Sequence, residues 1–468
     1  MKQILVKDII NVTKGKLIIG KENTICENFS KDTRKIEKGD IYIGIKGETF
    51  DGSKFWKQAL ENGASVAIVE NIDFSNENLE KFQDKSIILV ENTLEALYEI
   101  AKFKRSLYNI PVIAITGSVG KTSTKDIVAN VVSQKYKTLK TVGNNNNNIG
   151  MPFTILRLKD EEAMVLEMGM NHFGEISLLS AIAKPDICII TNIGTSHIGN
   201  LGSRENILKA KLEILEGCEK PTVIINNDND LLHNWYKTNQ NKINIKTYGI
   251  QNKSDLNAEN IILEKESSKF TCKFLNEKAE IQVPVGGEHF VLNSLCAGAV
   301  GLELGISPEQ IKLGIESFEL TKKRMDITKL ENGISIINDA YNASFESMQA
   351  SLKYLSEFKE NRKIAVLGDM FELGDFSKEL HEKVGSEVVK NKIDILICSG
   401  ELAKNIANQA EKQGMEKEKI HYLENKEDII SLLKEISKKD DIILFKASNG
   451  MKFFEIAEKV GGKLIWAK

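Results

Sequence analysis

Short apolar runs alternate with longer amphipathic stretches along the middle of the chain. The apolar runs have the length of buried strands and lie at residues 112–116, 163–168, 187–193 and 222–226. Helical periodicity follows from Thr122, Gly174 and Arg204. This alternation is typical of βα units that share a mostly parallel sheet. It predicts a doubly wound α/β core between about residues 112 and 300.

The two flanking regions carry the same alternation at different strength. Beyond Gly333, strand-length runs at residues 334–338, 363–367, 394–398 and 441–445 predict a Rossmann-like α/β domain. Before residue 105 the weaker strand signals, at residues 41–45, 65–69 and 86–90, predict a small α/β recognition domain. The chain has 468 residues, more than a single core supports. We therefore expect three α/β domains, at residues 1–105, 106–320 and 321–468.

Charge and composition exclude several classes of function. Lysine and arginine number 63 and aspartate and glutamate 66, so the net charge of −3 offers no basic surplus for nucleic acid. The first 20 residues mix charged with apolar residues, unlike a signal peptide, and no apolar run approaches the roughly 20 residues that span a bilayer. The six cysteines form no CxxC pair, and Cys188 and Cys398 lie in strand-like runs. We expect a soluble, cytoplasmic protein without stable membrane insertion.

A glycine-rich turn follows the strand-like run that ends at Thr116. The turn consists of Gly117, Ser118, Val119, Gly120, Lys121, Thr122 and Ser123 and leads into a helical stretch. In this context backbone N–H groups and a helix N-terminus face one anion, a lysine reaches the outer phosphates and a threonine hydroxyl can ligate Mg²⁺. Residue 115 is isoleucine where the longer Walker pattern has glycine, so an ordinary tight βα turn is the alternative. The flanking strand and helix favour a phosphate-binding loop.

Two further polar residues follow strand-like runs of the same region. Glu167 lies near the end of residues 163–168, and His197 follows residues 187–193. The carboxyl ends of parallel strands share one edge of a sheet, where ligands bind, and a carboxylate there is a natural Mg²⁺ ligand. Taken singly, each residue is more often a cap or a surface group. Beside a phosphate loop, the two favour a metal-nucleotide site.

These residues together resemble the Mur ligase family, the ATP-dependent amide-forming enzymes of peptidoglycan precursor synthesis. The resemblance covers all three segments and implies that the glycine-rich loop holds ATP. It also implies that Thr122, Glu167 and His197 hold magnesium, with two ions expected. Lys211, within Ala210 to Glu213, matches the family's special lysine, which in several relatives carries a CO₂-derived carbamate. An unmodified lysine that pairs with phosphate is the alternative.

The same resemblance implies further contacts to the nucleotide and the substrates. Asn293 would contact adenine, Arg324 a phosphate and Asp339 the ribose, so that ATP lies between the second and third domains. The segment 143–152 resembles the family's asparagine-rich loop, in which we expect Asn144 and Asn147 to contact substrate. Polar turns of the first domain resemble its UDP-sugar-peptide recognition segment. The residues concerned are Asp32, Thr33, Arg34, Lys46, Gly47, Thr49 and Asp51.

Within the family, residues 368–374 followed by His381 resemble the branch that adds D-alanyl-D-alanine to UDP-N-acetylmuramoyl-tripeptide. The resemblance implies an acyl phosphate formed from the tripeptide carboxylate and ATP, then attack by the dipeptide amine. His381 or Asp369 would take the amine proton or bind an end of the dipeptide. Asn449 stands where the family usually has arginine. Arginine offers a carboxylate a planar charged fork that asparagine cannot reproduce. Any contribution of that arginine to dipeptide affinity is therefore made differently here or lost. The expected dipeptide contacts of the third domain are Tyr341, Asn342, Asp369, Met370, Glu372 and His381.

Three other functions remain as alternatives. One is a ligase of the same architecture with another acceptor, such as a folylpolyglutamate synthetase or the neighbouring muramoyl-peptide ligase. The others are a nucleotide-dependent binding protein without chemistry and a motor or GTPase-like switch. The motif at residues 369–374 argues against the first alternative, and dipeptide-dependent phosphate release would separate the other two from a ligase. We expect a monomer whose partners are small molecules.

Overall fold

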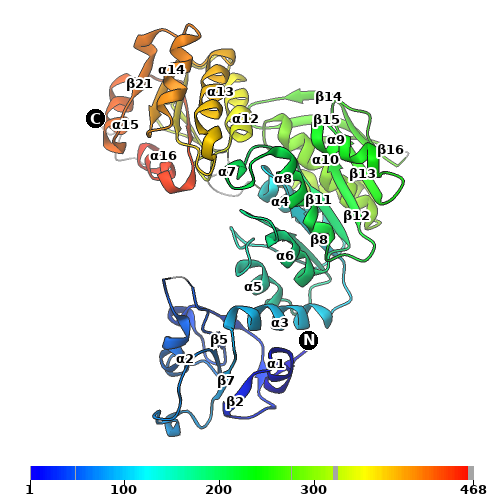
Figure 1. Cartoon of the computed structure of the whole chain (residues 1–468). Helices are drawn as coiled ribbons and strands as arrows, with labels where there is room; N and C mark the ends of the chain where they lie inside the picture. Colours follow the sequence, from blue (N-terminus) through cyan, green and yellow to red (C-terminus); the bar gives the residue numbers. More distant parts are fainter. Residues whose placement is uncertain (1, 48, 276, 320–324, 462–468) are drawn as a thin grey trace. The chain divides into compact units, whose positions relative to one another are not determined.

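The structure, a computed structural model, describes residues 2–47, 49–275, 277–319 and 325–461. It has a mixed α/β architecture of three domains, as the alternation of apolar runs predicts. The described strands form four sheets, of two, five, nine and six strands. Figure 1 colours the elements from blue at the N-terminus to red at the C-terminus.

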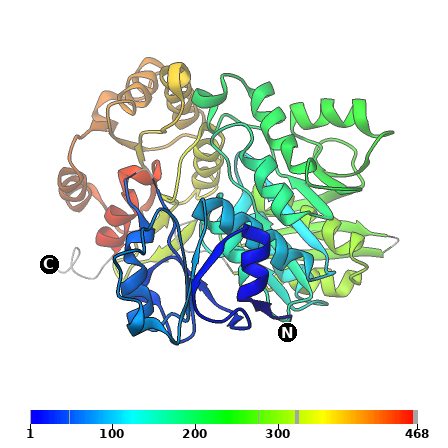
Figure 2. The ribbon, with the colours of Figure 1, turned by 60° about the horizontal axis from the view of Figure 1, so that its bottom comes forward.

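A five-stranded sheet organises the amino-terminal region, blue in Figures 1 and 2. Its central strand β6 (Val66–Val69) is buried throughout, as expected for a parallel strand covered on both faces. Trp56 packs edge-on against Phe74 and Phe82 in the core of this sheet. The strand order is β2 (Lys16–Ile19), β7 (Ser86–Leu89), β6, β5 (Ile41–Ile43) and β4 (Phe29–Ser30), with β2 antiparallel to β7. The remaining elements are β1 (Ile4–Leu5), β3 (Ile25–Cys26), α1 (Val6–Thr13), α2 (Trp56–Glu61) and α3 (Thr93–Ser106).

The middle of the chain contributes a nine-stranded sheet. Its strand order is β16 (Glu277–Val283), β15 (Ser268–Phe274), β14 (Leu256–Leu263), β13 (Asn244–Gly249), β12 (Thr222–Asn226), β11 (Ile187–Ile190), β8 (Val112–Thr116), β10 (Ala163–Glu167) and β9 (Thr138–Lys140). β10 runs parallel to β8 and β9, whereas β14, β15 and β16 form an antiparallel meander. The strands predicted at 112–116, 163–168 and 222–226 are confirmed. β11 ends at Ile190, earlier than predicted, and beyond it the backbone carbonyl of Asn192 accepts a bond from the N–H of Ser118 in the glycine-rich loop.

Helices of the middle region begin where the periodicity predicts. α4 (Lys121–Val132) packs against α10 (Glu288–Glu303) and α11 (Pro308–Glu316), and α3 packs against α5 (Gly150–Leu156) and α6 (Glu175–Ala183). Ser307 and Gln310 form a capping box at the start of α11, where Pro308 occupies the first turn. The other helices here are α7 (Ile198–Leu201), α8 (Arg204–Leu212) and α9 (Asp230–Asn239).

The carboxyl-terminal domain is built on a six-stranded, mostly parallel sheet. Its order is β17 (Asp326–Lys329), β18 (Ser335–Asn338), β22 (Ile442–Lys446), β19 (Lys363–Gly368), β20 (Ile395–Ser399) and β21 (Ile420–Tyr422), and only β17 is antiparallel among these described strands. Apolar residues of α15 (Lys426–Ile436) and α16 (Phe453–Gly461) share one core cluster with alternate residues of these strands. α12 (Phe345–Ser356) packs on β19 and β22, followed by α13 (Ser377–Lys390) and α14 (Lys404–Lys412).

The chain divides into two compact units. The first comprises Met1–Thr116, Tyr136–Cys188 and Leu212–Thr222, and the second comprises Gly117–Lys135, Ile189–Lys211 and Val223–Lys468. The domain boundaries near residues 105 and 320 stay predictions. Among the described residues, no helix is both long enough and apolar enough to cross a membrane.

Candidate active site

The glycine-rich loop lies in the second unit, between β8 and α4. Gly117 has a φ of +151°, and a Cβ built there would lie 1.9 Å from Oγ1 of Thr191, so only glycine fits. Gly120 has a φ of +80° and directly precedes Lys121, the first residue of α4. The loop therefore has the sharp turn and the helix N-terminus that an anion site needs.

Residues that follow β11 hold this loop in place. Asn192 accepts a hydrogen bond from the backbone N–H of Val119 (3.0 Å) and donates one to its carbonyl (3.0 Å). The hydroxyl of Ser118 accepts a bond from the N–H of Gly194 (2.9 Å). Thr191 and Asn192 are site residues that the sequence reasoning missed. The sequence could have indicated them, because these two polar residues directly follow the apolar run at residues 187–190 and lie shortly before Gly194.

Two lysines lie close to the loop. The ammonium of Lys121 donates to the carbonyls of Gly117 (2.8 Å) and Ser118 (3.4 Å), at the loop itself. Lys211, on α8, is only 2% exposed. Burial, and secondly the positive charge of Lys121, lower the pKa of Lys211 well below its usual value. Both causes act against the charged form of this side chain.

Asn293 reaches the same loop from α10. Its Oδ1 accepts a hydrogen bond from Oγ1 of Thr124 (3.0 Å), and a Cβ on Gly120 would lie 3.6 Å from that oxygen. The side chain is 7% exposed, and its Nδ2 has no hydrogen-bond partner among the described residues. A buried amide donor without a partner is costly, so this nitrogen is poised to donate to a ligand.

The segment that carries His197 is held by two glutamates from the carboxyl-terminal domain, in the same unit. Glu346, in the first turn of α12, accepts bonds from the N–H (2.8 Å) and the hydroxyl (3.1 Å) of Thr195. Nδ1 of His197 lies 2.5 Å from Oε2 of Glu372, and the N–H of Gly199 donates to the Glu372 carbonyl (3.1 Å). The structure thus brings together a predicted metal ligand and a predicted dipeptide contact. The sequence reasoning missed Glu346.

In the first unit, Glu167 ends β10 and is buried. Its Oε1 accepts a hydrogen bond from Nδ2 of Asn146 (2.7 Å). Asn147 instead accepts bonds from the N–H groups of Ile149 and Gly150 at the start of α5, and Asn144 is exposed. Of the asparagine run, Asn146 is therefore the residue that contacts Glu167.

The predicted recognition residues of the amino-terminal region make mostly local contacts. The carboxylate of Asp32 accepts two hydrogen bonds of 2.8 Å from the guanidinium of Arg34. These bonds, and to a smaller extent a bond from the backbone N–H of Arg34, lower the pKa of Asp32 to about 2. Asp51 accepts a bond from the N–H of Ser53. The remaining contacts are Thr33 to Gln58 (3.2 Å), the Lys46 ammonium to Glu70 (3.9 Å) and the Gly47 N–H to Phe50, and Thr49 is exposed.

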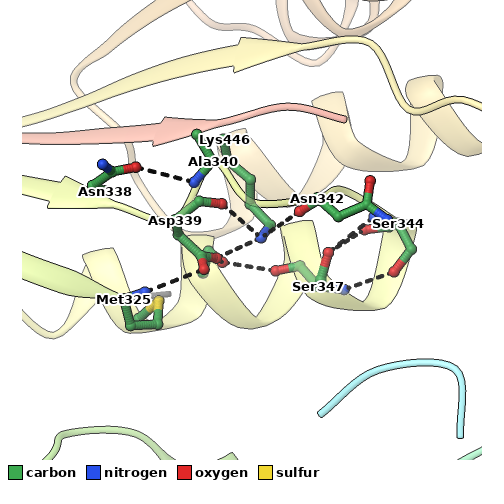
Figure 3. Close-up of polar contacts among 9 residues, drawn as sticks. Met325, Asn338, Asp339, Ala340, Asn342, Ser344, Ser347 and Lys446 are labelled. Atoms are coloured by element: carbon green, nitrogen blue, oxygen red, sulfur yellow. Dashed lines mark hydrogen bonds and ion pairs between the residues drawn. The ribbon is translucent and has the colours of Figure 1, made fainter. Parts of the chain in front are cut away.

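Asp339 follows β18 and lies in a polar network of the carboxyl-terminal domain (Figure 3). Its carboxylate accepts bonds from the N–H of Met325 (3.2 Å) and the hydroxyl of Ser351 (2.6 Å), and forms an ion pair with Lys446. Arg324, predicted to contact a phosphate, lies outside the described residues. The carbonyl of Tyr341 accepts a bond from Nδ2 of Asn449 (2.9 Å).

His381 is completely buried beneath the loop at residues 369–374. Its Nε2 accepts a bond from the N–H of Met370 (3.0 Å), and its Nδ1 lies 2.6 Å from the Ser377 carbonyl, so both ring nitrogens are engaged. Burial lowers the pKa of His381, and burial raises the pKa of Asp369, whose Oδ1 accepts a bond from the N–H of Ala403 (2.7 Å). The imidazole therefore supports the loop in its neutral form.

Comparisons with known proteins agree with this architecture. Residues 28–105 match the Mur ligase family catalytic domain, residues 115–301 the Mur ligase middle domain, and residues 323–449 the Mur ligase glutamate ligase domain. The chain is 40% identical over 459 residues to the UDP-N-acetylmuramoyl-tripeptide--D-alanyl-D-alanine ligase of Bacillus subtilis, covering 97% of each chain.

Solved structures give the same picture. A crystal structure of MurF from Acinetobacter baumannii superimposes with a TM-score of 0.87 at 28% identity, covering 98% of this chain and 99% of that one. MurF ligase from Thermotoga maritima, solved in complex with ADP, has a TM-score of 0.81 at 29% identity and covers 93% and 97%. The family resemblance inferred from the motifs is thereby confirmed. The chain belongs to the Mur ligase family and is of the MurF type.

Proposed function

We propose that this chain is an ATP-dependent ligase that joins D-alanyl-D-alanine to UDP-N-acetylmuramoyl-tripeptide in cytoplasmic peptidoglycan precursor synthesis. The observation that carries the proposal is the nucleotide-binding geometry of the second unit. There, the glycine loop, the N-terminus of α4 and the unpartnered Nδ2 of Asn293 lie together. The full-length similarity to ligases of this type supplies the substrate class.

For ATP, each predicted contact has a physical role. The N–H groups of the first turn of α4 face the phosphates, whereas those of Ser118 and Val119 hold the loop through Asn192. The Lys121 ammonium moves from the loop carbonyls to the outer phosphates. Asn293 donates from Nδ2 to the adenine, Asp339 accepts from the ribose and Arg324 pairs with a phosphate. The ADP complex of the Thermotoga maritima relative supports nucleotide binding in this family.

For Mg²⁺, we assign Thr122, Glu167, His197 and, once carbamylated, Lys211. A hydroxyl, a carboxylate and an imidazole are donors that metal ions accept, but an ammonium is not. As an ammonium, Lys211 would repel the metal. Burial lowers its pKa and so favours the amine, which would add to CO₂ to give an anionic carbamate and a proton. When bound, Mg²⁺ neutralises charge on the transferring phosphoryl group.

For the acyl donor, we assign Asp32, Thr33, Arg34, Lys46, Gly47, Thr49, Asp51, Asn144 and Asn147. For the dipeptide, we assign Tyr341, Asn342, Asp369, Met370 and Glu372, with His381 holding the N–H of Met370. The domain assignment is 1–105 for muramoyl-peptide recognition, 106–320 for ATP and 321–468 for the dipeptide. In this proposal the chain is a monomer, and it contributes to cell-wall synthesis and so to cell shape and division.

The proposed reaction has two steps without a covalent bond to the protein. A tripeptide carboxylate oxygen attacks the γ-phosphorus, the bond to the bridging oxygen of ADP breaks, and an acyl phosphate forms. The neutral dipeptide amine then attacks the acyl carbon, phosphate leaves, and the amine loses a proton. Phosphoryl transfer asks mainly for positioning and charge neutralisation, which Lys121 and the loop N–H groups supply.

The test is phosphate release from Mg-ATP with UDP-N-acetylmuramoyl-tripeptide, with and without D-alanyl-D-alanine, and with the peptide product weighed by mass spectrometry. We expect release only with both substrates and a product heavier by one dipeptide residue pair. Lys121→Met is the matched inactive variant, because it keeps the side-chain stem but removes the charge. Phosphate release at the same rate with and without D-alanyl-D-alanine would contradict the ligase proposal.

A further inference from the structure

Lys446 is a buried lysine that the proposed reaction does not use directly. It ends β22, its side chain is 3% exposed, and its ammonium forms an ion pair with Oδ2 of Asp339. The same nitrogen lies 3.3 Å from the carbonyl oxygens of Asp339 and Asn342 (Figure 3). A buried ammonium persists only where oxygens surround it, and three donors here meet three acceptors. Lys446 thereby fixes the turn that follows β18.

The Asp339 carboxylate has one oxygen that is fully engaged and one that is not. Oδ2 accepts from the hydroxyl of Ser351 (2.6 Å) and from Lys446, whereas Oδ1 accepts from the backbone N–H of Met325 (3.2 Å). Each carboxylate oxygen has about two acceptor positions, so Oδ1 keeps one for a further donor. The side chain of Asp339 is 13% exposed, so it is not completely closed off from the surroundings.

We propose that Lys446 is a positioning residue for nucleotide recognition, which orients Asp339 so that Oδ1 accepts a hydrogen bond from a ribose hydroxyl. The inference deepens the proposed function, since it rests on ribose binding by Asp339. Three donors on a compact ammonium suit the three oxygens around it, which the planar fork of arginine would not match. Ser351 supports the same orientation through its bond to Oδ2.

The test is a thermodynamic cycle that combines a change in the protein with a change in the nucleotide. Equilibrium binding to the full chain is measured without turnover. ATP, 2′-deoxy-ATP and 3′-deoxy-ATP are titrated into the wild type and Lys446→Met. In the wild type, loss of the contacted hydroxyl should weaken binding by roughly tenfold, as expected for a bond to a charged acceptor. In Lys446→Met, ATP itself should bind about tenfold more weakly, and the deoxy penalty should shrink to less than about twofold.

Lys363→Met is the matched control. Lys363 begins β19, the strand beside β22, and pairs with Asp394 (3.2 Å) at the opposite end of the sheet. This variant should keep the full deoxy penalty. If Lys446→Met also keeps it, the positioning role is overturned and Lys446 serves stability alone.

Two further outcomes remain decisive. If the wild type shows no penalty with either deoxy nucleotide, Asp339 does not contact ribose and the inference fails, while ATP binding and ligation would still stand. If Lys446→Met does not fold by circular dichroism, Ser351→Ala replaces it, because it removes only one bond to Oδ2. A reduced deoxy penalty in Ser351→Ala supports the inference, and an unchanged penalty overturns it.

Discussion

The unpartnered Nδ2 of Asn293 should lower the free energy of unfolding of the protein without nucleotide. The same nitrogen should contribute to nucleotide affinity. In Asn293→Leu one hydrogen bond to Thr124 is lost, worth about 1 kcal/mol, but the unpartnered Nδ2 is removed, which had cost about 1–3 kcal/mol. The free energy of unfolding should therefore stay within about 2 kcal/mol of the wild type. ATP affinity should fall roughly tenfold, since the donor to adenine is gone.

Asn227 provides the matched control in the same unit. It is 2% exposed, its Nδ2 donates to the Lys253 carbonyl (3.0 Å) and the Ser254 hydroxyl (3.2 Å), and its Oδ1 lies 2.9 Å from Nδ1 of His233. Asn227→Leu loses three satisfied bonds, about 3 kcal/mol. At about 2–4 °C per kcal/mol, that lowers the first thermal transition by roughly 6–12 °C.

The assay is thermal unfolding without nucleotide, followed by ATP titration. We expect a shift of only a few degrees for Asn293→Leu, well below that of Asn227→Leu. Equal shifts in the two variants would show that Nδ2 of Asn293 carries no cost in the free protein. An unchanged dissociation constant for ATP would refute its contact with adenine.

Four other measurements follow from the structure. Burial lowers the pKa of His289 to about 4, so between about pH 6.5 and 4 the unfolded chain binds a proton at this residue and the folded chain does not. The free energy of unfolding should therefore fall as the pH drops from about 6.5 to 4, and it should fall less in His289→Gln. The bond from Cys188 lowers the pKa of Cys218, so Cys218 should be the first thiol alkylated by iodoacetamide in peptide mapping. Labelled bicarbonate should give a carbamate carbon signal by NMR in the wild type but not in Lys211→Arg, because burial lowers the pKa of Lys211 and favours the amine that adds to CO₂. Asn449→Arg should lower the KM for the dipeptide and leave the KM for ATP unchanged, since it adds a carboxylate-binding fork; an altered KM for ATP instead would place residue 449 elsewhere.

Much of the fold follows from local patterns in the sequence. Buried parallel strands such as β8 and β12 are short apolar runs, and their bounds match the prediction. The antiparallel strands β14 to β16 were missed, because exposed charged residues interrupt their apolar pattern. The end of β11 was placed too late, since the backbone carbonyl of Asn192 bonds to the N–H of Ser118 in the glycine-rich loop and not to a strand.

The glycine-rich loop could be read from the sequence because its chemistry is contiguous. The partners of the site could not, because they are brought together from distant elements. Glu346 holds Thr195 across 151 positions, and Lys446 pairs with Asp339 across 107. Burial also affects chemistry that residue type leaves open, as shown by the lowered pKa of Lys211 and by the two engaged ring nitrogens of His381.

Transfer of oxygen from the tripeptide to phosphate tests the central claim most directly. UDP-N-acetylmuramoyl-tripeptide labelled with ¹⁸O in its terminal carboxylate is incubated with Mg-ATP and D-alanyl-D-alanine, and the released phosphate is analysed by mass spectrometry. The account predicts one ¹⁸O atom in each phosphate and one retained in the new amide, because the carboxylate oxygen attacks the γ-phosphorus. Unlabelled phosphate, released by water, would contradict an acyl phosphate and with it the ligase account.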